Sequence, residues 1–328
     1  MSIINLFKNP KDKNQRDDSD EEEKEIRRPK KEVYKPWGKK ERLLVLSVLL
    51  VTILSSSILG ISSRDWKLPG IPRLTFPKSF LGEETYVIEK KTDGKATGTS
   101  QEKIDQTISA FKNKTDNTSG VWGFYAIDLS DKVSYGLNQD EIFQAASLIK
   151  LPIMSLVYKK YEEGEINLDE KVPGSTSTYR ELVREMGKRS DNSAQITLVN
   201  TFGKGKIDAY INEIRMRKTS LEENETSPKD VGLFFKMLWE EDLVSTKSRD
   251  EILGYLTNTI YEDWLVAGIP KGIRVAHKYG SEVHVVNDAG IVYGPKPFVV
   301  VIMSKGVVEK EANEIFPELA KIIYDAEK

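Results

Sequence analysis

One ten-residue stretch carries both a pair of reactive side chains and a helical apolar pattern: Phe143-Gln144-Ala145-Ala146-Ser147-Leu148-Ile149-Lys150-Leu151-Pro152. Apolar residues continue at helical spacing beyond it, which predicts a helix from about Ala146 to Glu163. Ser147 and Lys150 would lie one turn apart on that helix, so their side chains point to the same side. Backbone N–H groups near the helix N-terminus can donate to a developing oxyanion. The stretch therefore predicts a helix whose first turn is suited to nucleophilic chemistry.

Composition restricts which groups could carry out that chemistry. The chain has no Cys and only two His, His277 and His284. This excludes disulfides, thiolate metal sites and Cys nucleophiles, and it disfavours a Ser-His-Asp triad. A lysine that is partly buried can lose its proton and activate a serine hydroxyl. Ser-x-x-Lys alone is weak evidence, because average composition yields about one chance match in a chain of this size.

Charge is balanced over the 328 residues, with 49 Lys and Arg against 51 Asp and Glu. A net charge of −2 gives no basic field for nucleic acid, so we expect no nucleic-acid partner. The net charge of the whole chain conceals segments that differ in composition. Residues 1–42 hold 13 basic and 10 acidic side chains with few apolar positions, which predicts a disordered, charged cytoplasmic tail.

Residues 43–63 carry no charge and are mostly aliphatic, which predicts a transmembrane helix. A buried core helix and a cleaved signal peptide are the alternatives. The prolines at 69, 72 and 77 argue against the first, and the 42 residues before the apolar run argue against the second. Seven basic residues in 28–42 against four in 64–78 place the N-terminus in the cytoplasm. We expect a single-pass cell-membrane protein with an extracytoplasmic stalk or linker over 64–100.

From residue 101 to residue 328 the patterns are those of one globular domain. Strands are predicted at 121–129, 133–137, 272–279, 282–293 and 297–304, and the helical patterns are at 104–111, 146–163, 179–187, 192–202, 206–213, 228–240, 247–257 and 308–326. The predicted fold class is α/β (α+β). It is an antiparallel five-stranded sheet flanked by N- and C-terminal helices, with an all-helical lobe inserted between its second and third strands.

Two further short motifs follow the Ser-x-x-Lys pair in the chain. Ser190-Asp191-Asn192 lies between two helical patterns of the lobe, and Lys278-Tyr279-Gly280 lies on a predicted strand. The first is also a good helix N-cap sequence, and the second could be an ordinary sheet edge with a solvated Lys. Glycine on a strand lets a substrate backbone approach closely.

Taken together, the order of these motifs resembles that of the class A β-lactamase-like and penicillin-binding serine hydrolases. The resemblance covers about residues 101–328. It extends to Phe143–Ser147 before the serine, to Thr226-Ser227-Pro228 at a later helix start, and to Val275-Ala276-His277 before Lys278. It implies a β-lactamase/transpeptidase-like fold.

The resemblance also implies catalytic roles. Ser147 would attack the carbonyl of a β-lactam or of a D-Ala-D-Ala-like peptide and form an acyl-enzyme. Lys150 would be the general base, with a pKa lowered by Lys278 and by desolvation. Ser190 would pass the proton to the departing nitrogen.

Substrate-binding roles follow from the same resemblance. Asn192 would hold the substrate side-chain amide, and Lys278 would attract the substrate carboxylate. The backbone N–H groups of Ser147 and Ser281 would form the oxyanion hole, with Tyr279 and Gly280 lining the site. No cofactor and no metal are implied, and both His residues are expected to be structural.

The chain departs from the family pattern at two places. The family has a small hydroxyl residue where this chain has Tyr279, which puts carboxylate recognition in question. It also has a Glu-x-x-Leu-Asn loop that activates the deacylating water, and the corresponding stretch, 218–225, is short and lacks that pattern. Glu222, Glu223 and Glu225 are candidate substitutes, with a solvated acidic turn as the alternative.

Three functions remain open from the sequence. The first is a membrane-anchored serine hydrolase that is acylated by β-lactams on Ser147 and hydrolyses them, with slow deacylation as one variant. The second is a penicillin-binding D,D-peptidase that acts on peptidoglycan peptides, which the short loop favours. The third is a catalytically weak sensor or scaffold for β-lactams or peptidoglycan. The expected partners are a β-lactam or cell-wall peptide and, through residues 43–63, membrane lipid.

Overall fold

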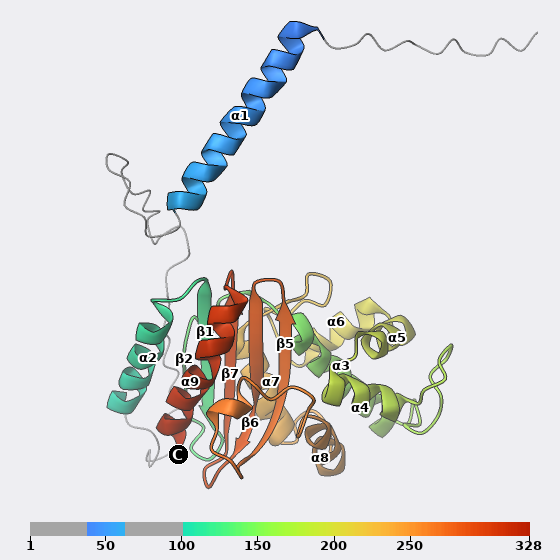
Figure 1. Ribbon diagram of the computed structural model, residues 1–328. Coiled ribbons are helices and arrows are strands. Elements are labelled where there is room, and N and C mark those ends of the chain that lie inside the picture. Colours follow the sequence, from blue (N-terminus) through green and yellow to red (C-terminus); the bar gives the residue numbers. More distant parts are fainter. Residues whose placement is uncertain (1–37, 63–100) are drawn as a thin grey trace, which may run out of the picture. The chain divides into compact units, whose positions relative to one another are not determined.

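The computed structural model describes residues 38–62 and 101–328 (Figure 1). The predicted stalk over 64–100 and most of the predicted tail over 1–42 lie outside the described residues. The chain divides into two compact units, residues 1–76 and 77–328. They are treated separately below.

In the first unit, the charge-free run forms a helix, α1, over Lys39–Ser62. The helix begins earlier than the predicted 43–63 because Lys39 to Arg42 are good helix formers that extend its first turn. Judged by length and hydropathy, none of the helices in 38–62 and 101–328 qualifies as a membrane span. The helical part of the prediction is confirmed, and its transmembrane part is not supported.

A five-stranded antiparallel sheet forms the centre of the second unit, in the order β2-β1-β7-β6-β5 (Figure 1). Its strands are β1 Val121–Asp128, β2 Ser134–Leu137, β5 Arg274–Glu282, β6 Val285–Tyr293 and β7 Phe298–Lys305. All pairs are antiparallel, and β5 is the edge strand next to β6. The predicted five-stranded antiparallel sheet is confirmed.

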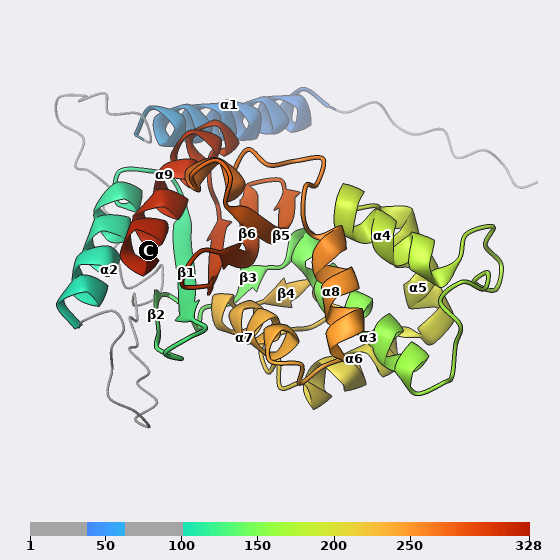
Figure 2. The same ribbon diagram turned by 90° about the horizontal axis from the view of Figure 1, so that it is seen from below.

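Helices cover both faces of this sheet, and the side chains of β1 show why. Trp122 and Phe124 belong to a core shared with α2 (Gln101–Thr115) and α9 (Glu309–Glu327), while Tyr125 and Ile127 belong to a second core on the other face. Alternate residues of a strand point to opposite faces, so a strand buried on both sides is apolar throughout. Figures 1 and 2 show α2 and α9 on one face and α7 (Pro228–Trp239) on the other.

Between β2 and β5 the chain forms the predicted helical lobe (Figure 2). Its helices are α3 Lys150–Glu162, α4 Tyr179–Arg189, α5 Asn192–Phe202, α6 Lys204–Glu213 and α8 Thr246–Tyr255. Local caps set the helix starts. Thr178 and Glu181 form a capping box on α4, and Ser227 caps α7 with Pro228 in its first turn.

The predicted helix 146–163 is in fact two elements. A 3-10 turn, η2, spans Ala146–Ile149, and α3 begins at Lys150. A small sheet that was not predicted pairs β3 (Phe143–Gln144) with β4 (Glu225–Thr226). Two-residue strands carry no periodicity, so only the folded chain reveals this pairing. The small sheet ties the segment before Ser147 to the 218–225 loop.

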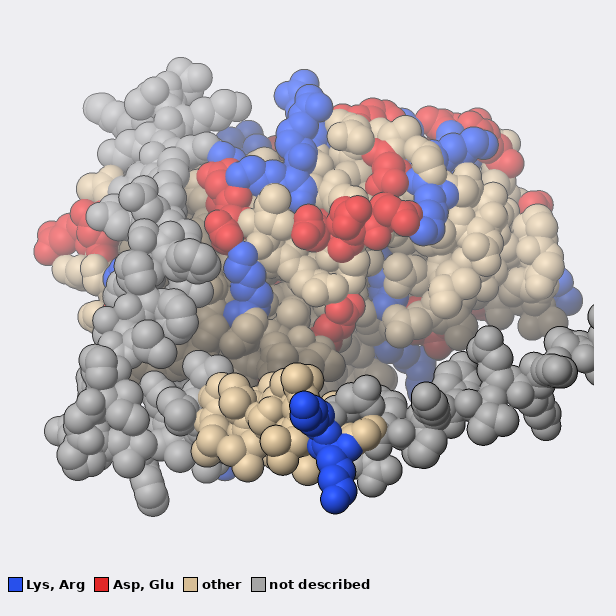
Figure 3. Space-filling model, turned by 90° about the horizontal axis from the view of Figure 1, so that it is seen from above, with Lys and Arg blue, Asp and Glu red and all other residues tan. Residues whose placement is uncertain are grey.

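The surface of the domain carries both charges. Figure 3 shows Lys and Arg side chains interspersed with Asp and Glu over the face seen from above. Several of the domain's charges are paired, as in the bridges Lys305–Glu141 and Lys236–Glu240. Exposed pairs of this kind contribute little stability, about 0–1 kcal/mol each.

Candidate active site

Three segments far apart in the sequence bring the predicted catalytic side chains together. Lys150 Nζ lies 2.7 Å from Ser147 Oγ, 3.0 Å from the backbone oxygen of Ser190 and 2.6 Å from Asn192 Oδ1. Ser190 Oγ lies 3.4 Å from Lys150 Nζ and 2.9 Å from Lys278 Nζ. The nucleophile turn, the α4–α5 junction and strand β5 therefore meet at one cluster.

Lys150 is held in a geometry suited to a base. A neutral amine has two N–H donors and one lone pair. If the donors serve the Ser190 carbonyl and Asn192 Oδ1, the lone pair is left for the Ser147 hydroxyl, 2.7 Å away. Lys150 is 1 % exposed, and this burial lowers its pKa to about 8. The charges of Asp191 and Glu282 act in the opposite direction.

Lys278 is the second buried amine of the cluster. It is fully buried, and its Nζ donates to Ser190 Oγ and, at 2.7 Å, to the backbone oxygen of Tyr279. Burial and, second, the charge of Lys150 lower its pKa well below the usual range, against the effect of Asp288. Desolvation was expected to lower the pKa of Lys150 and does so. The charge of Lys150 lowers the pKa of Lys278, so the two amines disfavour each other's protonation.

Two non-glycine residues in the left-handed region shape the site. Ser190 has φ +56° and ψ +34°, ends α4, and turns both its carbonyl and its hydroxyl toward Lys150. Ala146, immediately before Ser147, has φ +48°. Such conformations cost on the order of 1–3 kcal/mol each and tend to cluster at functional sites. The strain lies at the two backbone positions that orient the serine hydroxyls.

Gly280 allows β5 to approach the nucleophile turn. A Cβ atom at this position would lie 2.8 Å from the backbone nitrogen of Ser147 and 3.2 Å from Ala145 O. The glycine was expected to make room for a substrate backbone. In the structure the close neighbour is the protein's own backbone, because β5 lies directly against η2. Ser281, the predicted second oxyanion donor, follows on β5 and is exposed.

Gly280→Ala should therefore displace Ser147 from Lys150. A methyl group 2.8 Å from a backbone nitrogen forces β5 and η2 apart, and a shift of about 1 Å at reacting groups can reduce a rate about 10²-fold. We expect the acylation rate of Ser147 by a fluorescent penicillin to fall by about that factor. The control is Gly254→Ala, where a Cβ atom meets nothing within 4 Å. An unchanged rate in Gly280→Ala would contradict this role.

Tyr279 is half-buried, and its ring packs against Tyr261 and His277. Lys278 Nζ lies 4.1 Å from its ring centroid. The phenol therefore projects from β5 beside the amine cluster. Asn192 is exposed at the start of α5, with Oδ1 used by Lys150, so its Nδ2 is the end that remains for a substrate oxygen.

The three candidate deacylation bases are not part of the cluster. Glu222 is 61 % exposed in its side chain and pairs with Lys204, Glu223 is exposed, and Glu225 sits in β4 opposite Gln144. Within residues 101–328, no Asp or Glu side chain hydrogen-bonds to Ser147 or Lys150. Sequence reasoning missed Glu282, whose charge acts on Lys150 and whose Oε1 accepts a 2.9 Å bond from Asn224.

Two buried polar residues of β6 that support the site, Asn287 and Asp288, were also missed. Asn287 on β6 donates to Gln144 O at 2.8 Å and accepts from the Ser304 N–H, which ties the segment before Ser147 to the sheet. His277, next to Lys278, pairs through Nδ1 with Asp288 at 2.8 Å. The sequence signal that could have revealed them is the pair Asn287-Asp288 inside the apolar run of β6. Polar side chains buried there need hydrogen-bond partners.

His284 lies at the β5–β6 hairpin and contacts Val307 O through Nδ1, so the two His residues do not meet. Across the described ranges, no group of three or more His, Asp or Glu side chains could hold a metal ion.

The sequence was also compared with models of known protein families and with curated proteins. The model of a family described as the beta-lactamase enzyme family matches residues 102–326. No curated protein sequence matches the chain significantly.

Solved structures share the fold. A structure of PBP-A has a TM-score of 0.64 and 24 % identity, over 71 % of this chain and 98 % of that one. A PBP-A mutant in an acyl-enzyme complex with penicillin G has a TM-score of 0.63 and 24 % identity, over 70 % and 98 %. The class A beta-lactamase of the last common ancestor of Gram-negative bacteria has a TM-score of 0.64 and 22 % identity, over 67 % and 98 %. At these identities the likeness concerns the fold.

Proposed function

Because the chain belongs to the beta-lactamase enzyme family, we propose that it is a serine hydrolase that β-lactams acylate on Ser147. One observation carries the proposal. The amine of Lys150, which has a pKa of about 8, lies 2.7 Å from the Ser147 hydroxyl. It also hydrogen-bonds to the Ser190 carbonyl and to Asn192. This arrangement activates a serine without histidine.

In the first step, the Ser147 Oγ–H bond breaks and its proton moves to Lys150 Nζ. A bond forms between Oγ and the carbonyl carbon, and the carbonyl oxygen takes up the electron pair. The N–H groups of Ser147 and Ser281 are the proposed donors to that oxygen. Donors already in place lower the barrier because they need no reorganisation when the charge develops.

In the second step, the carbonyl re-forms, the carbon–nitrogen bond breaks, and the nitrogen takes a proton. Ser190 Oγ is the proposed relay, since it lies 3.4 Å from Lys150 Nζ and 2.9 Å from Lys278 Nζ. Ser190 would donate its own proton to the nitrogen and regain one from Lys150. Lys150 thereby returns to its neutral form, and an acyl ester remains on Ser147.

Hydrolysis of that ester needs a water and a base. Glu222, Glu223 and Glu225 make no hydrogen bond to Ser147 or Lys150, and this supports slow deacylation. The same observation favours a second candidate function, a penicillin-binding D,D-peptidase that acts on peptidoglycan peptides and is trapped by β-lactams.

Turnover separates these two candidates. We expect the purified full-length chain to open the ring of about one equivalent of a chromogenic cephalosporin in a burst, followed by a much slower steady state. The reason is that, within residues 101–328, no carboxylate that could activate water hydrogen-bonds to Ser147 or Lys150. Stopped-flow absorbance measures both phases. Fast linear turnover without a burst would contradict slow deacylation and identify an efficient β-lactamase. Release of D-Ala from an acyl-D-Ala-D-Ala peptide would identify the peptidase.

We also propose that the domain acts outside the cytoplasmic membrane. The support is the charge-free sequence of residues 43–63, with more basic residues before it than after it. Recovery of the full-length chain in the soluble cytoplasmic fraction of lysed cells would contradict this location.

A further inference from the structure

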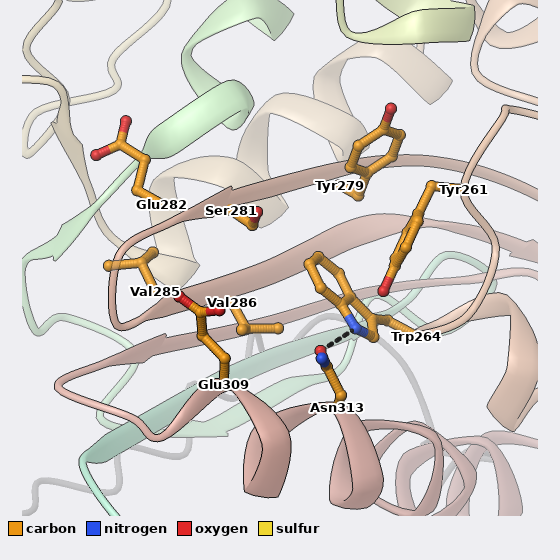
Figure 4. A pocket seen from close by; sticks show the side chains of 9 residues that line it. All are labelled: Tyr261, Trp264, Tyr279, Ser281, Glu282, Val285, Val286, Glu309 and Asn313. Carbon is orange, nitrogen blue, oxygen red and sulfur yellow. Dashed lines mark hydrogen bonds between the residues drawn. The ribbon is translucent and has the colours of Figure 1, made fainter.

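A pocket of about 260 Å³ opens beside β5, next to the proposed active site (Figure 4). Two of its lining residues, Tyr279 and Ser281, are also predicted substrate-binding residues. Its other walls come from the loop before β5, from β6 and from the start of α9. The pocket and the site that contains Ser147 therefore share one edge strand.

Aromatic side chains form one side of this pocket. The ring centroids of Tyr261 and Trp264 lie 4.6 Å apart, and those of Tyr261 and Tyr279 lie 5.3 Å apart. Trp264 is 5 % exposed, packs on Phe316, and donates from Nε1 to Asn313 at 2.9 Å. Figure 4 shows this bond at the base of the pocket. Because packing and a hydrogen bond hold the indole, the aromatic wall is formed before any ligand arrives.

Acidic side chains are the only charged groups in the lining. Glu282 and Glu309 line the pocket, while no Lys, Arg or His does. Glu309 is exposed in the first turn of α9, at the opposite side of the pocket from Tyr279 in Figure 4. Lys278 contacts the Tyr279 ring but does not line the pocket. Aromatic faces together with carboxylates attract a cation and disfavour an anion.

We propose that this pocket binds an ammonium group carried by the substrate, on the amine side of the carbon–nitrogen bond that breaks when Ser147 is acylated. That side is indicated because Tyr279, a predicted substrate-binding residue, lines the pocket, and Lys278, the predicted partner of the substrate carboxylate, contacts the Tyr279 ring. This inference rests on the proposed function in one respect, namely that the ligand is the enzyme's substrate. Binding of an ammonium group in the pocket does not itself depend on acylation. It assigns a positively charged group to a position where a substrate carboxylate would be repelled by Glu309.

The site is tested with a matched pair of probes, choline and 3,3-dimethylbutan-1-ol, which have the same shape and differ in charge. Isothermal titration calorimetry of the purified full-length chain measures the affinity for each probe. We expect choline to bind about fivefold more tightly than the neutral alcohol. Glu309→Gln should reduce that ratio to about twofold. Glu314→Gln removes an exposed carboxylate of the same helix outside the pocket and should leave it unchanged.

Equal affinity for the two probes, lack of binding by either, or an unchanged ratio in Glu309→Gln would each overturn the proposal.

A second comparison links the site to the substrate. Two cephalosporins with the same acyl side chain are used, one with a C3′ pyridinium and one with a C3′ acetoxy group. The ratio of their acylation rates should fall about threefold in Glu309→Gln and stay constant in Glu314→Gln. A constant ratio in both variants would overturn the assignment to the amine side of the broken bond.

Choline binding and covalent labelling by penicillin test the ammonium site and the proposed function separately. Choline binding without any penicillin adduct would leave the ammonium site in place and remove the hydrolase. A penicillin adduct without choline binding would do the reverse.

Discussion

Replacing Lys150 with Met should reduce the acylation rate of Ser147 by about 10²- to 10⁴-fold. Removal of a positioned base has an effect of about that size. Lys150 is buried with three polar partners, so Met fills the volume and leaves Ser147 without a proton acceptor. The rate is measured with a fluorescent penicillin under pseudo-first-order conditions, and a thermal melt checks that the variant is folded.

Lys150→Arg makes the test sharper. Arginine keeps the positive charge and its donors but stays protonated, so it cannot act as a base. We therefore expect it to be as inactive as Lys150→Met. Lys160→Arg, at an ion-paired position of the same helix, should acylate at the normal rate. Substantial activity in Lys150→Arg would mean that Lys150 acts through its charge.

The same base predicts a pH dependence. With a pKa of about 8, Lys150 is mostly protonated at pH 6 and mostly neutral at pH 9. Only the neutral form accepts the Ser147 proton, so the acylation rate should rise about tenfold per pH unit below 8 and level off above it. A rate that falls between pH 6 and 8 would contradict this assignment.

Much of the fold could be predicted because the sheet strands are buried on both faces. Such strands are long apolar runs, as in Val299–Met303, and the turns between them are short. The helices of the lobe have clear periods and caps. The pairing of β3 with β4 could not be predicted, because it joins two residues to two others 81 and 83 positions away.

The catalytic cluster was predictable only in part. Ser147 and Lys150 lie one turn apart, so local geometry already places them together. Ser190 and Lys278 are 88 residues apart, and only the resemblance associated them before the fold was known. The requirement for Gly280 depends on the distance between β5 and η2, which no local pattern contains.

The aromatic pocket was not foreseen. Tyr261 and Trp264 lie in a loop without periodicity, and Glu309 belongs to a helix that begins 45 residues after Trp264. Burial of Trp264 on Phe316 brings that loop to α9. The prediction of a membrane span used the charge-free run of residues 43–63, the prolines after it and the basic residues on either side. The structure bears out the helix over Lys39–Ser62 and not the span.

Ser147→Ala should abolish covalent labelling by penicillin completely. Alanine removes the atom that forms the ester, and Lys150 has no other hydroxyl as close, since Ser190 Oγ is 3.4 Å away against 2.7 Å for Ser147 Oγ. Ser193→Ala, at an exposed position of α5, is the matched control and should label normally.

The central claim is that Ser147 is the nucleophile, and the most direct measurement is the site of the adduct. The full-length chain is incubated with a fluorescent penicillin, digested, and analysed by mass spectrometry. We expect one adduct per chain, on the peptide that contains Ser147, and none in Ser147→Ala. An adduct that persists in Ser147→Ala, or that maps to another residue of the unmodified chain, would contradict the assignment.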